Sequence, residues 1–424
     1  MWYSKTAAEL IGSASRCAKC GGTEIRKETD ILDVWFDSGS SHLAVLKSAN
    51  NLPWPSDMYL EGGDQYRGWF HSSLLIGVGL KGSAPYRESA THGWTLDADG
   101  RAMSKSAGSL GPDKILKKFG ADILRLWTAS VDFTEDVRIS DTILDRLSEA
   151  YRKLRNTFKY ALGNISDFDP AVHAVPGEDL LSIDAWILLR AEDLVRQCLA
   201  WYKDYEFHKV YRAVYNFAIT DLSAMYFDIL KDRLYTTGTN SRARRSGQTA
   251  IYRLNQALVR LLAPILSFTC EEVWGYIKGT KPESVHLETF PTPESLSEGI
   301  SAAQRERAAE LDRLVPVRDQ VLKALDTARQ DKVIGSSLEA AVFLEADGEL
   351  YSLLEKYAVD LPSWFIVSQV GLERKPVNEL LVRVERARGD KCERCWKYTT
   401  DVGSNEEFPT VCASCAAVLP EFLS

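Results

Sequence analysis

Four cysteines near the C-terminal end of the chain have the spacing of a metal site. Cys392 and Cys395 form one C-x-x-C pair, and Cys412 and Cys415 form a second after sixteen intervening residues. Four thiolates from two such pairs can complete a tetrahedron around Zn²⁺, which leaves no open position for a substrate. The spacing therefore predicts one structural zinc ion per chain. The alternative is four reduced thiols without metal, but the polar stretch between the pairs would then have little to hold its fold.

A third pair, Cys17 and Cys20, has the same local spacing but no second pair close to it in the sequence. Its missing ligands could come from polypeptide outside this chain, or the pair could bind no metal. Both interpretations stay open.

A lysine between two serines marks a second candidate site, in the stretch GRAMSKSAG at residues 100–108. The ammonium group of Lys105, on a loop bounded by glycines, suits a polyphosphate whose negative charge grows in a transition state. Ser104 and Ser106 can bond phosphate oxygens or brace the loop. The alternative is an ordinary solvated surface loop.

The stretch YLEGGDQYRGWF at residues 59–70 crowds Glu61, Asp64 and Arg67 around paired glycines. Paired glycines let a backbone approach a ligand closely. The carboxylates could hold an α-ammonium group or ribose hydroxyls. The alternative is a polar turn before a helix.

Cationic and aromatic residues surround the C-terminal cysteines, and they include Lys391, Arg394 and Trp396. Such side chains beside a rigid knuckle suit RNA phosphates and unstacked bases. A second basic stretch, SRARRSGQ, lies at residues 241–248. The alternative for each patch is a solvated charged face.

The elements that must position these residues begin with a region of alternating strands, helices and glycine loops at residues 31–139. ILDVWF at 31–36 predicts a strand, HSSLLIGVGL at 71–80 a buried helix or strand, and YRESATHGWTLD at 86–97 a strand that ends in a loop. A proline opens the helix expected after the Lys105 loop. This alternation predicts an α/β layer structure.

Residues 140–298 predict an all-α bundle. The apolar residues Leu147, Tyr151, Leu154, Phe158 and Leu162 recur at helical spacing and form one stripe, which is typical of core packing. A Pro/Ser/Gly-rich stretch at 290–299 then predicts a domain boundary. The stretches AAVFLEA at 340–346 and WFIVSQV at 364–370 predict two strands separated by a helix.

Composition limits the classes of protein. The chain has 424 residues, of which 45% are hydrophobic and 26% charged, and this predicts roughly two to four domains. It shows neither a secretory signal pattern nor an apolar run long enough to cross a membrane, so a cytoplasmic location without membrane partners is expected. The net charge of −8 argues against an overall basic coat but allows a local basic face for nucleic acid.

The order of these stretches resembles the class I aminoacyl-tRNA synthetases. The Lys105 loop resembles the Lys-Met-Ser-Lys-Ser signature of that class. The finer similarity is to the isoleucyl branch, and it rests on a set of stretches from about residue 30 to the end: DILDVWFDSGSSH (30–42), MYLEGGDQYRGWFHSSL (58–74), GADILRLW (120–127), SEAYRKLRNTFKYALGN (148–164), DLSAMYFDILKDRLY (221–235), KVIGSSLEA (332–340) and GDKCERCWKY (389–398).

The resemblance implies ATP-dependent attachment of isoleucine to tRNA(Ile) through an isoleucyl-adenylate, with ATP taken together with Mg²⁺. Lys105 would be the catalytic lysine that stabilises departing pyrophosphate. The residues implied on the adenylate and ATP side are Glu61, Gly62, Asp64, Gln65, His92, Gly93, Ser104 and Ser106. The four C-terminal cysteines match the family's zinc ligands. The tRNA-binding residues implied or suggested are Arg152, Arg155, Lys391, Arg394 and Trp396.

The same resemblance implies a multidomain chain: the second half of a Rossmann-type α/β domain, an all-α bundle, a small α/β domain and a zinc knuckle. The predicted ranges are 1–30 for the remnant of a connective insertion, 31–139 for the catalytic half, 140–298 for the anticodon-binding bundle, 299–385 for the small α/β domain and 386–424 for the zinc module.

The sequence departs from the family at two places. Ala102 replaces the first lysine of the signature, and Ala107, Gly108 and Ser109 replace its usual Leu-Gly-Asn continuation. In addition, none of the six histidines stands in the His-x-Gly-His context of the family's other signature. The chain is therefore expected to correspond to a C-terminal portion that needs the N-terminal remainder of the enzyme as a partner and that is inactive alone.

Two alternatives remain from the sequence. The first is a non-catalytic tRNA-binding protein derived from a synthetase. The intact stretch at 59–70 and Lys105 argue against it, because a pure binding protein needs neither. The second is a fragment of a valyl or leucyl enzyme.

Overall fold

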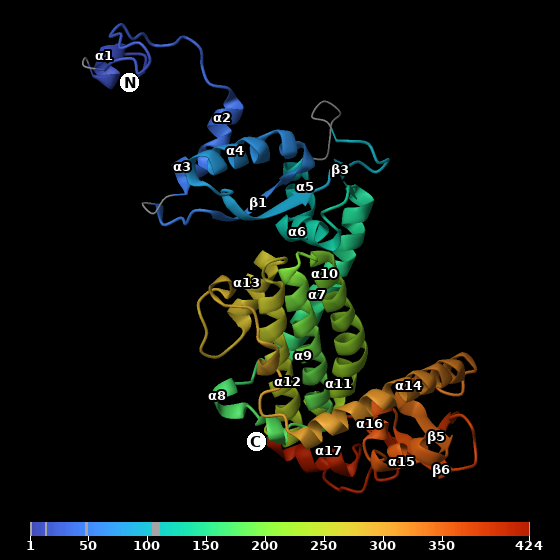
Figure 1. Cartoon of the computed structure of the whole chain (residues 1–424). Coiled ribbons are helices and arrows are strands. Elements are labelled where there is room, and N and C mark those ends of the chain that lie inside the picture. Colours follow the sequence, from blue (N-terminus) through green and yellow to red (C-terminus); the bar gives the residue numbers. More distant parts are fainter. Residues whose placement is uncertain (1, 13–14, 47–49, 104–110, 424) are drawn as a thin grey trace. The chain divides into compact units, whose positions relative to one another are not determined.

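The computed structural model describes residues 2–12, 15–46, 50–103 and 111–423 (Figure 1). Contacts divide the chain into two compact units. Unit 1 comprises residues 1–102 and 133–138, and unit 2 comprises residues 103–132 and 139–424. Each unit is described separately.

Unit 1 is built on two parallel strands, β1 (Ser56–Gly62) and β2 (Tyr86–His92), which are joined by helix α4 (Trp69–Lys81). The buried ring of Tyr59 in β1 stacks on Trp69 at 4.3 Å between ring centroids, so α4 covers one face of the sheet. A short pair, β3 (Thr95–Leu96) and β4 (Val137–Arg138), is also parallel. The shorter helices of the unit are α1 (Ala7–Ile11), α2 (Val34–Gly39) and α3 (Ser41–Val45).

The strand predicted at ILDVWF is wrong, because residues from Val34 onward form helix α2. The Asp33 side chain accepts a hydrogen bond from the backbone N–H of Trp35 and caps this helix. That local bond outweighs the β preference of the apolar residues that follow. The strand predicted after residue 86 is confirmed as β2.

Unit 2 begins with α5 (Pro112–Phe119) and α6 (Ala121–Ser130) and continues into a bundle of long helices. The bundle contains α7 (Asp141–Asn164), α9 (Ser182–Lys203), α10 (Phe207–Asn216), a π-helical segment (Phe217–Tyr226), α11 (Phe227–Thr236), α12 (Arg242–Leu262) and α13 (Ser267–Tyr276), with the short α8 (Pro170–His173) beside them. Pro112 opens α5, and the side chains of Ser140 and Ser241 cap α7 and α12. The predicted all-α region is confirmed.

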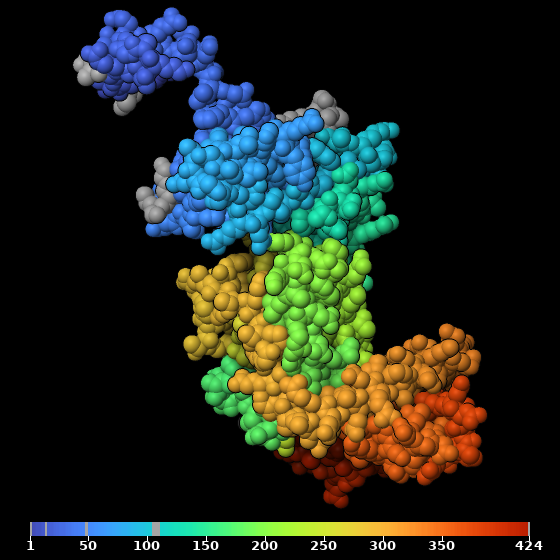
Figure 2. Space-filling view, in the orientation of Figure 1, coloured from blue at the N-terminus to red at the C-terminus, as the bar shows by residue number. Residues whose placement is uncertain are grey.

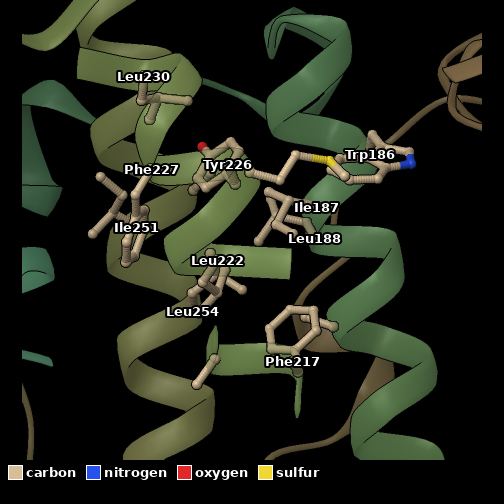
Figure 3. Close-up of a cluster of buried hydrophobic side chains, with 14 of the residues drawn as sticks. Trp186, Ile187, Leu188, Phe217, Leu222, Tyr226, Phe227, Leu230, Ile251 and Leu254 are labelled. Carbon is tan, nitrogen blue, oxygen red and sulfur yellow. The ribbon is translucent and has the colours of Figure 1, made fainter. Parts of the chain in front are cut away.

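The core of the bundle is dense and aromatic. Trp186, Leu222 and Tyr226 are almost completely buried. Figure 3 shows Leu222 and Tyr226 between α9 and α12, whereas Trp186 lies apart from them on α9, where its ring packs edge-to-face on Trp364. The stripe on α7 packs as predicted, with Leu154 and Phe158 buried in this core. A further helix, α14 (Ala302–Gln330), lies directly against the green residues of the bundle in the space-filling view (Figure 2).

The C-terminal α/β part has a three-stranded sheet with the order β6-β5-β7. The central strand β5 (Ala340–Ala346) pairs in parallel with β6 (Gln369–Arg374) and antiparallel with β7 (Leu381–Arg386). Helices α15 (Gly348–Lys356) and α16 (Leu361–Phe365) lie between β5 and β6. The strand predicted at AAVFLEA is confirmed. The strand predicted at WFIVSQV is wrong except for Gln369 and Val370, which begin β6; Trp364 and Phe365 instead end helix α16, which Pro362 opens.

The last part of the chain contains the four cysteines and consists of two short strands, two short helices and the segments that connect them. These elements are β8 (Asp390–Lys391), β9 (Tyr398–Thr399), α17 (Ala413–Val418) and α18 (Pro420–Leu423). They enclose a small core of their own, which consists of Cys392, Val411, Cys412, Cys415 and Ala416. Among the described residues of the whole chain, no helix has the length and apolar character needed to cross a membrane.

Candidate functional site

The four C-terminal cysteines converge. Their sulfur atoms all lie within 4.8 Å of one another, and the Sγ atoms of Cys395 and Cys412 are 3.9 Å apart. Four sulfurs on a tetrahedron around zinc would be separated by about 3.8 Å. Cys392, Cys412 and Cys415 are buried and Cys395 is partly exposed. The arrangement thus fits the predicted structural zinc ion and leaves no position for a substrate.

Backbone groups already favour a thiolate at this cluster. Burial opposes ionisation of Cys392, but backbone N–H groups of Cys395, Cys412 and Arg394 outweigh it and lower the pKa of Cys392 to about 6. Burial and the neighbouring thiols instead raise the pKa values of Cys395 and Cys415. All four sulfurs can therefore be thiolates together only if a cation offsets their mutual repulsion, which is what a bound zinc ion supplies.

The exposed aromatic ring beside the cluster is Trp396. Its backbone has a φ of +65°, its side chain is 59% exposed, and the ammonium of Lys391 lies 5.5 Å from the centre of its ring. Arg394 is instead held by the protein, because it donates a hydrogen bond to the backbone carbonyl of Thr236 and stacks on Phe422 at 5.3 Å. Lys391 and Trp396 are therefore the members of this group that are free to meet a ligand.

A cavity of about 420 Å³ lies beside Trp396. Its walls come from α11, the end of α16, the 3₁₀ turn Ser337–Glu339 and residues 394–397. They combine apolar residues with paired charges, since Lys231 pairs with Asp228 at 2.7 Å and Lys397 pairs with Asp232 at 2.6 Å. Ile366 has a φ of +58°, which is unusual for a β-branched residue, because it is the left-handed C-cap that ends α16.

The two arginines predicted on α7 make ion pairs within the protein. Arg152 pairs with Glu149 at 2.8 Å on the helix surface. Arg155 forms a two-point pair with Glu272 at 2.6 and 2.8 Å, which raises the pKa of Arg155 and ties α7 to α13. Within unit 2, Figure 1 places α13 at the opposite end from α17. The structure therefore does not bring these arginines to the cysteine cluster.

In unit 1, the predicted nucleotide-side residues meet at one edge of the sheet. The register of β1 and β2 places Glu61 beside Thr91 and Gly62 beside His92 at the carboxyl ends of both strands. Ligands of parallel α/β sheets bind at this edge. Asp64 and Gln65 follow in a 3₁₀ turn (Gly63–Arg67), where the Gln65 amide donates a hydrogen bond to the Asp64 carboxylate at 3.1 Å.

One glycine at this edge, Gly93, is sterically required by neighbouring backbone, whereas Gly62 meets only the end of a flexible side chain. A Cβ atom on Gly93 would lie 2.2 Å from the carbonyl oxygen of Glu135, and one on Gly62 would lie 2.8 Å from the Asp64 carboxylate. The Gly93 carbonyl also lies 2.8 Å from Nδ1 of His92. The backbone near His92 is therefore packed tightly, while the side chains of Glu61, Asp64 and His92 remain exposed to a ligand.

Lys105, Ser104 and Ser106 lie outside the described residues. The helix α6 that follows them is fastened to the bundle by two residues that the sequence did not single out. The buried carboxylate of Asp122 accepts hydrogen bonds from the backbone and hydroxyl of Thr269, and Arg125 donates to the backbone carbonyl groups of Pro264 and Ile265. Their partners are about 140 residues away in the sequence, so sequence spacing carries no signal of them.

The first cysteine pair is not part of a larger cluster in the described structure. Cys17 and Cys20 are both exposed, and the one group of three or more candidate ligands found among the described residues is the C-terminal one.

Three family descriptions match the chain. The description "tRNA synthetases class I (I, L, M and V)" matches residues 1–140, "Anticodon-binding domain of tRNA ligase" matches residues 184–344, and "Zinc finger found in FPG and IleRS" matches residues 389–418. The last range contains the four clustered cysteines.

Curated relatives share this organisation. The isoleucine–tRNA ligase of Syntrophotalea carbinolica is 50% identical over 99% of this chain and 46% of its own length, and that of Geobacter sulfurreducens is 49% identical over the same shares. The chain thus spans about half the length of these relatives. The solved ternary complex of Agrobacterium radiobacter K84 LeuRS with tRNA and LeuAMS has a similar fold, with a TM-score of 0.52 and 18% identity over 80% of this chain and 38% of that one.

Proposed function

The chain belongs to the class I tRNA synthetases of the isoleucine, leucine, methionine and valine group, and we propose that it is the C-terminal portion of an isoleucine–tRNA ligase. One observation carries the choice of isoleucine. Four sulfur atoms cluster within 4.8 Å in a segment that matches the zinc finger of FPG and IleRS, and the same chain is about half identical to isoleucine–tRNA ligases throughout. This observation also disfavours the valyl and leucyl alternatives.

The proposed reaction has two steps. The isoleucine carboxylate attacks the α-phosphorus of ATP, so that an acyl–phosphate bond forms and pyrophosphate leaves. The 3′ end of tRNA(Ile) then takes the aminoacyl group and releases AMP. Neither step needs a covalent protein intermediate, so catalysis consists mainly of orientation and electrostatic stabilisation. The exposed carboxylates of Glu61 and Asp64, at the ligand-binding edge of the sheet, would orient the adenylate.

We assign a structural role to the zinc ion. The four sulfurs would fill its coordination sphere, and Lys391 and Trp396 directly flank the turn that Cys392 and Cys395 close. Zinc would therefore act on RNA only indirectly, because it fixes the backbone that presents these two side chains. The proposed enzyme works in the cytoplasm, where its substrates tRNA(Ile), ATP and isoleucine are found.

Trp396→Ala is expected to weaken tRNA(Ile) binding by this chain about 5- to 150-fold, because stacking of one base on an aromatic ring contributes about 1–3 kcal/mol. Trp2→Ala is the matched control, since Trp2 is 52% exposed and also has a lysine over its ring. Filter binding at several salt concentrations measures both. The salt slope should change little, because the substitution removes no phosphate contact. Equal affinity of the two variants would contradict the assignment of Trp396.

Lys105→Ala is expected to slow isoleucine-dependent pyrophosphate exchange about 100-fold or more in a full-length enzyme that contains this chain, because it removes a cation from the departing pyrophosphate. Affinity for tRNA(Ile) should stay the same. Exchange at the unsubstituted rate would refute the role of Lys105. The chain alone is expected to show negligible exchange.

The competing proposal is a non-catalytic tRNA-binding protein. The pyrophosphate-exchange assay distinguishes this protein from the proposed ligase portion. A pure binding protein would support no exchange even when the N-terminal segment of a relative is added to it.

A further inference from the structure

A cavity of about 190 Å³ lies where helices α9, α11, α14 and α16 of unit 2 meet. Its walls are mainly aliphatic and come from Leu181, Ile183, Ile229, Leu311, Leu314 and Leu361, of which the last four are buried. At about 30 Å³ for each water, the cavity has room for about six waters or for one small molecule. Sites for small molecules combine apolar walls of this kind with a few convergent polar groups. The polar groups of this cavity therefore indicate what it can bind.

The first polar groups are two backbone N–H groups at the N-terminus of α9. An α-helix leaves its first four N–H groups without partners inside the helix. Here the N–H of Leu181 donates to the Ser246 hydroxyl at 2.9 Å, and the N–H of Asp184 donates to the Leu181 carbonyl at 2.9 Å. The N–H groups of Ser182 and Ile183, which both line the cavity, have no hydrogen-bond acceptor among the described residues. They are therefore available to a ligand, and the helix dipole favours a negatively charged group there.

A buried side chain supplies a third donor. Trp364 lines the cavity and is 4% exposed, and its Nε1–H has no hydrogen-bond partner in the part of the chain that the structure describes. Its ring packs edge-to-face on Trp186 of α9, with 5.9 Å between the ring centroids. A buried N–H without an acceptor is destabilising, so an acceptor in the cavity would satisfy it. Because Trp364 belongs to α16, the donors converge from two separate elements.

The charged groups of the cavity leave one negative charge without a counter-charge. Arg233 lines the cavity, but its guanidinium already pairs with the buried carboxylate of Asp184 at 2.8 and 3.0 Å. Asp360 is the other charged residue of the lining, and no described residue donates a hydrogen bond to its carboxylate. A ligand that is only an anion would meet this carboxylate uncompensated, and a ligand that is only a cation would leave the three N–H groups unsatisfied.

We propose that this cavity binds a free aliphatic α-amino acid in its zwitterionic form. The ligand's carboxylate accepts hydrogen bonds from the N–H groups of Ser182, Ile183 and Trp364. Its ammonium group pairs with Asp360, and its side chain lies against the aliphatic walls. The site goes beyond the proposed function, because it lies wholly within unit 2, whereas the described residues assigned to the adenylate lie in unit 1.

The experiment titrates the full chain with L-isoleucine, L-leucine and L-valine and follows binding by ligand-observed NMR. A Kd of about 1 mM or lower is expected for at least one of them, which suits a ligand of about nine non-hydrogen atoms. The deaminated and the decarboxylated analogues of isoleucine should each bind at least tenfold more weakly, because each leaves part of the polar lining unpaired. Hydrogen exchange with L-isoleucine present should slow at residues 181–185 and 357–366 and stay unchanged at 56–69.

Two substitutions test the site itself. Asp360→Asn should weaken binding of L-isoleucine at least tenfold, since it removes the counter-charge of the ammonium group. Ser182→Leu should abolish binding, because a larger side chain fills the cavity, and an unchanged urea midpoint would show that this variant is folded. Asp193→Asn is the matched control. Asp193 lies on the same helix, is 69% exposed and does not line the cavity, so the affinity should stay the same.

Three results would overturn the proposal. The first is the lack of saturable binding up to about 20 mM of every amino acid tested. The second is binding that slows exchange only at residues 56–69 or that neither substitution affects. The third is equal affinity for either analogue, which would show that the ligand need not be a zwitterion. None of these measurements uses adenylation, so a negative result leaves the proposed ligase function standing, and a failed pyrophosphate-exchange assay leaves this site standing.

Discussion

Cys392→Ser is expected to reduce bound zinc from about one equivalent per chain to a small fraction of that, because the site loses one of its four thiolates. The fold of residues 389–418 should be lost with the metal. Their core consists of five buried residues, three of which are the cysteines Cys392, Cys412 and Cys415. So small a core cannot offset the conformational entropy of the segment, whereas structural zinc contributes about 10–16 kcal/mol in isolated zinc fingers.

The measurements are metal analysis and hydrogen exchange of the same samples after anaerobic purification. Cys17→Ser is the matched control, because Cys17 belongs to a pair with the same spacing but is exposed and outside the cluster. It should leave both the zinc content and the protection of residues 389–418 unchanged. Protection that survives complete removal of metal would contradict the structural role of zinc. A fall in zinc content with Cys17→Ser would show a second site.

The sequence predicts the four-cysteine cluster for a physical reason. Metal ligation by two C-x-x-C pairs is a local pattern, because the two cysteines of each pair lie three residues apart, the first pair on a turn and the second at the start of helix α17. The helical stripe on α7 is local in the same sense, since Leu154 and Phe158 follow from the period of the helix alone. The carboxyl-edge residues Gly62 and His92 were grouped through resemblance, and the strand register then placed them side by side.

The errors have a physical reason as well. ILDVWF has the composition of a strand, but a single capping bond from Asp33 turns it into a helix. Trp364 and Phe365, the first two residues of WFIVSQV, are helical because Pro362 opens helix α16 just before them. The position of Arg155 on a predicted helix indicates a free cation. In the fold, Glu272 pairs with it although the two residues are 117 positions apart in the sequence. Contacts between distant residues carry no periodic signal.

The same limit hid a heavily bonded carboxylate of the bundle. Asp184 is completely buried and accepts hydrogen bonds from Tyr226 at 2.7 Å, from Ser246 at 2.6 Å and from Arg233 at 2.8 and 3.0 Å. Its partners lie on the π-helical segment, α11 and α12, so one side chain of α9 joins four parts of the bundle. Burial and the adjacent carboxylate also raise the pKa of Tyr226 and keep its hydroxyl protonated as a donor.

Asp184→Ala is therefore expected to lower the free energy of unfolding of the bundle by about 3–5 kcal/mol, because it leaves the buried guanidinium of Arg233 without its counter-charge. Asp193→Ala on the same helix is the control, since Asp193 pairs with Arg196 at 2.7 Å but is 69% exposed and should cost about 0–1 kcal/mol. Urea unfolding followed by tryptophan fluorescence, to which the buried Trp186 and Trp274 of the bundle contribute, measures both. Arg233→Met in the Asp184→Ala background should restore part of the loss, because it removes the orphaned charge. Equal losses from Asp184→Ala and Asp193→Ala would show that the buried network does not stabilise the bundle that carries the proposed anticodon-binding surface.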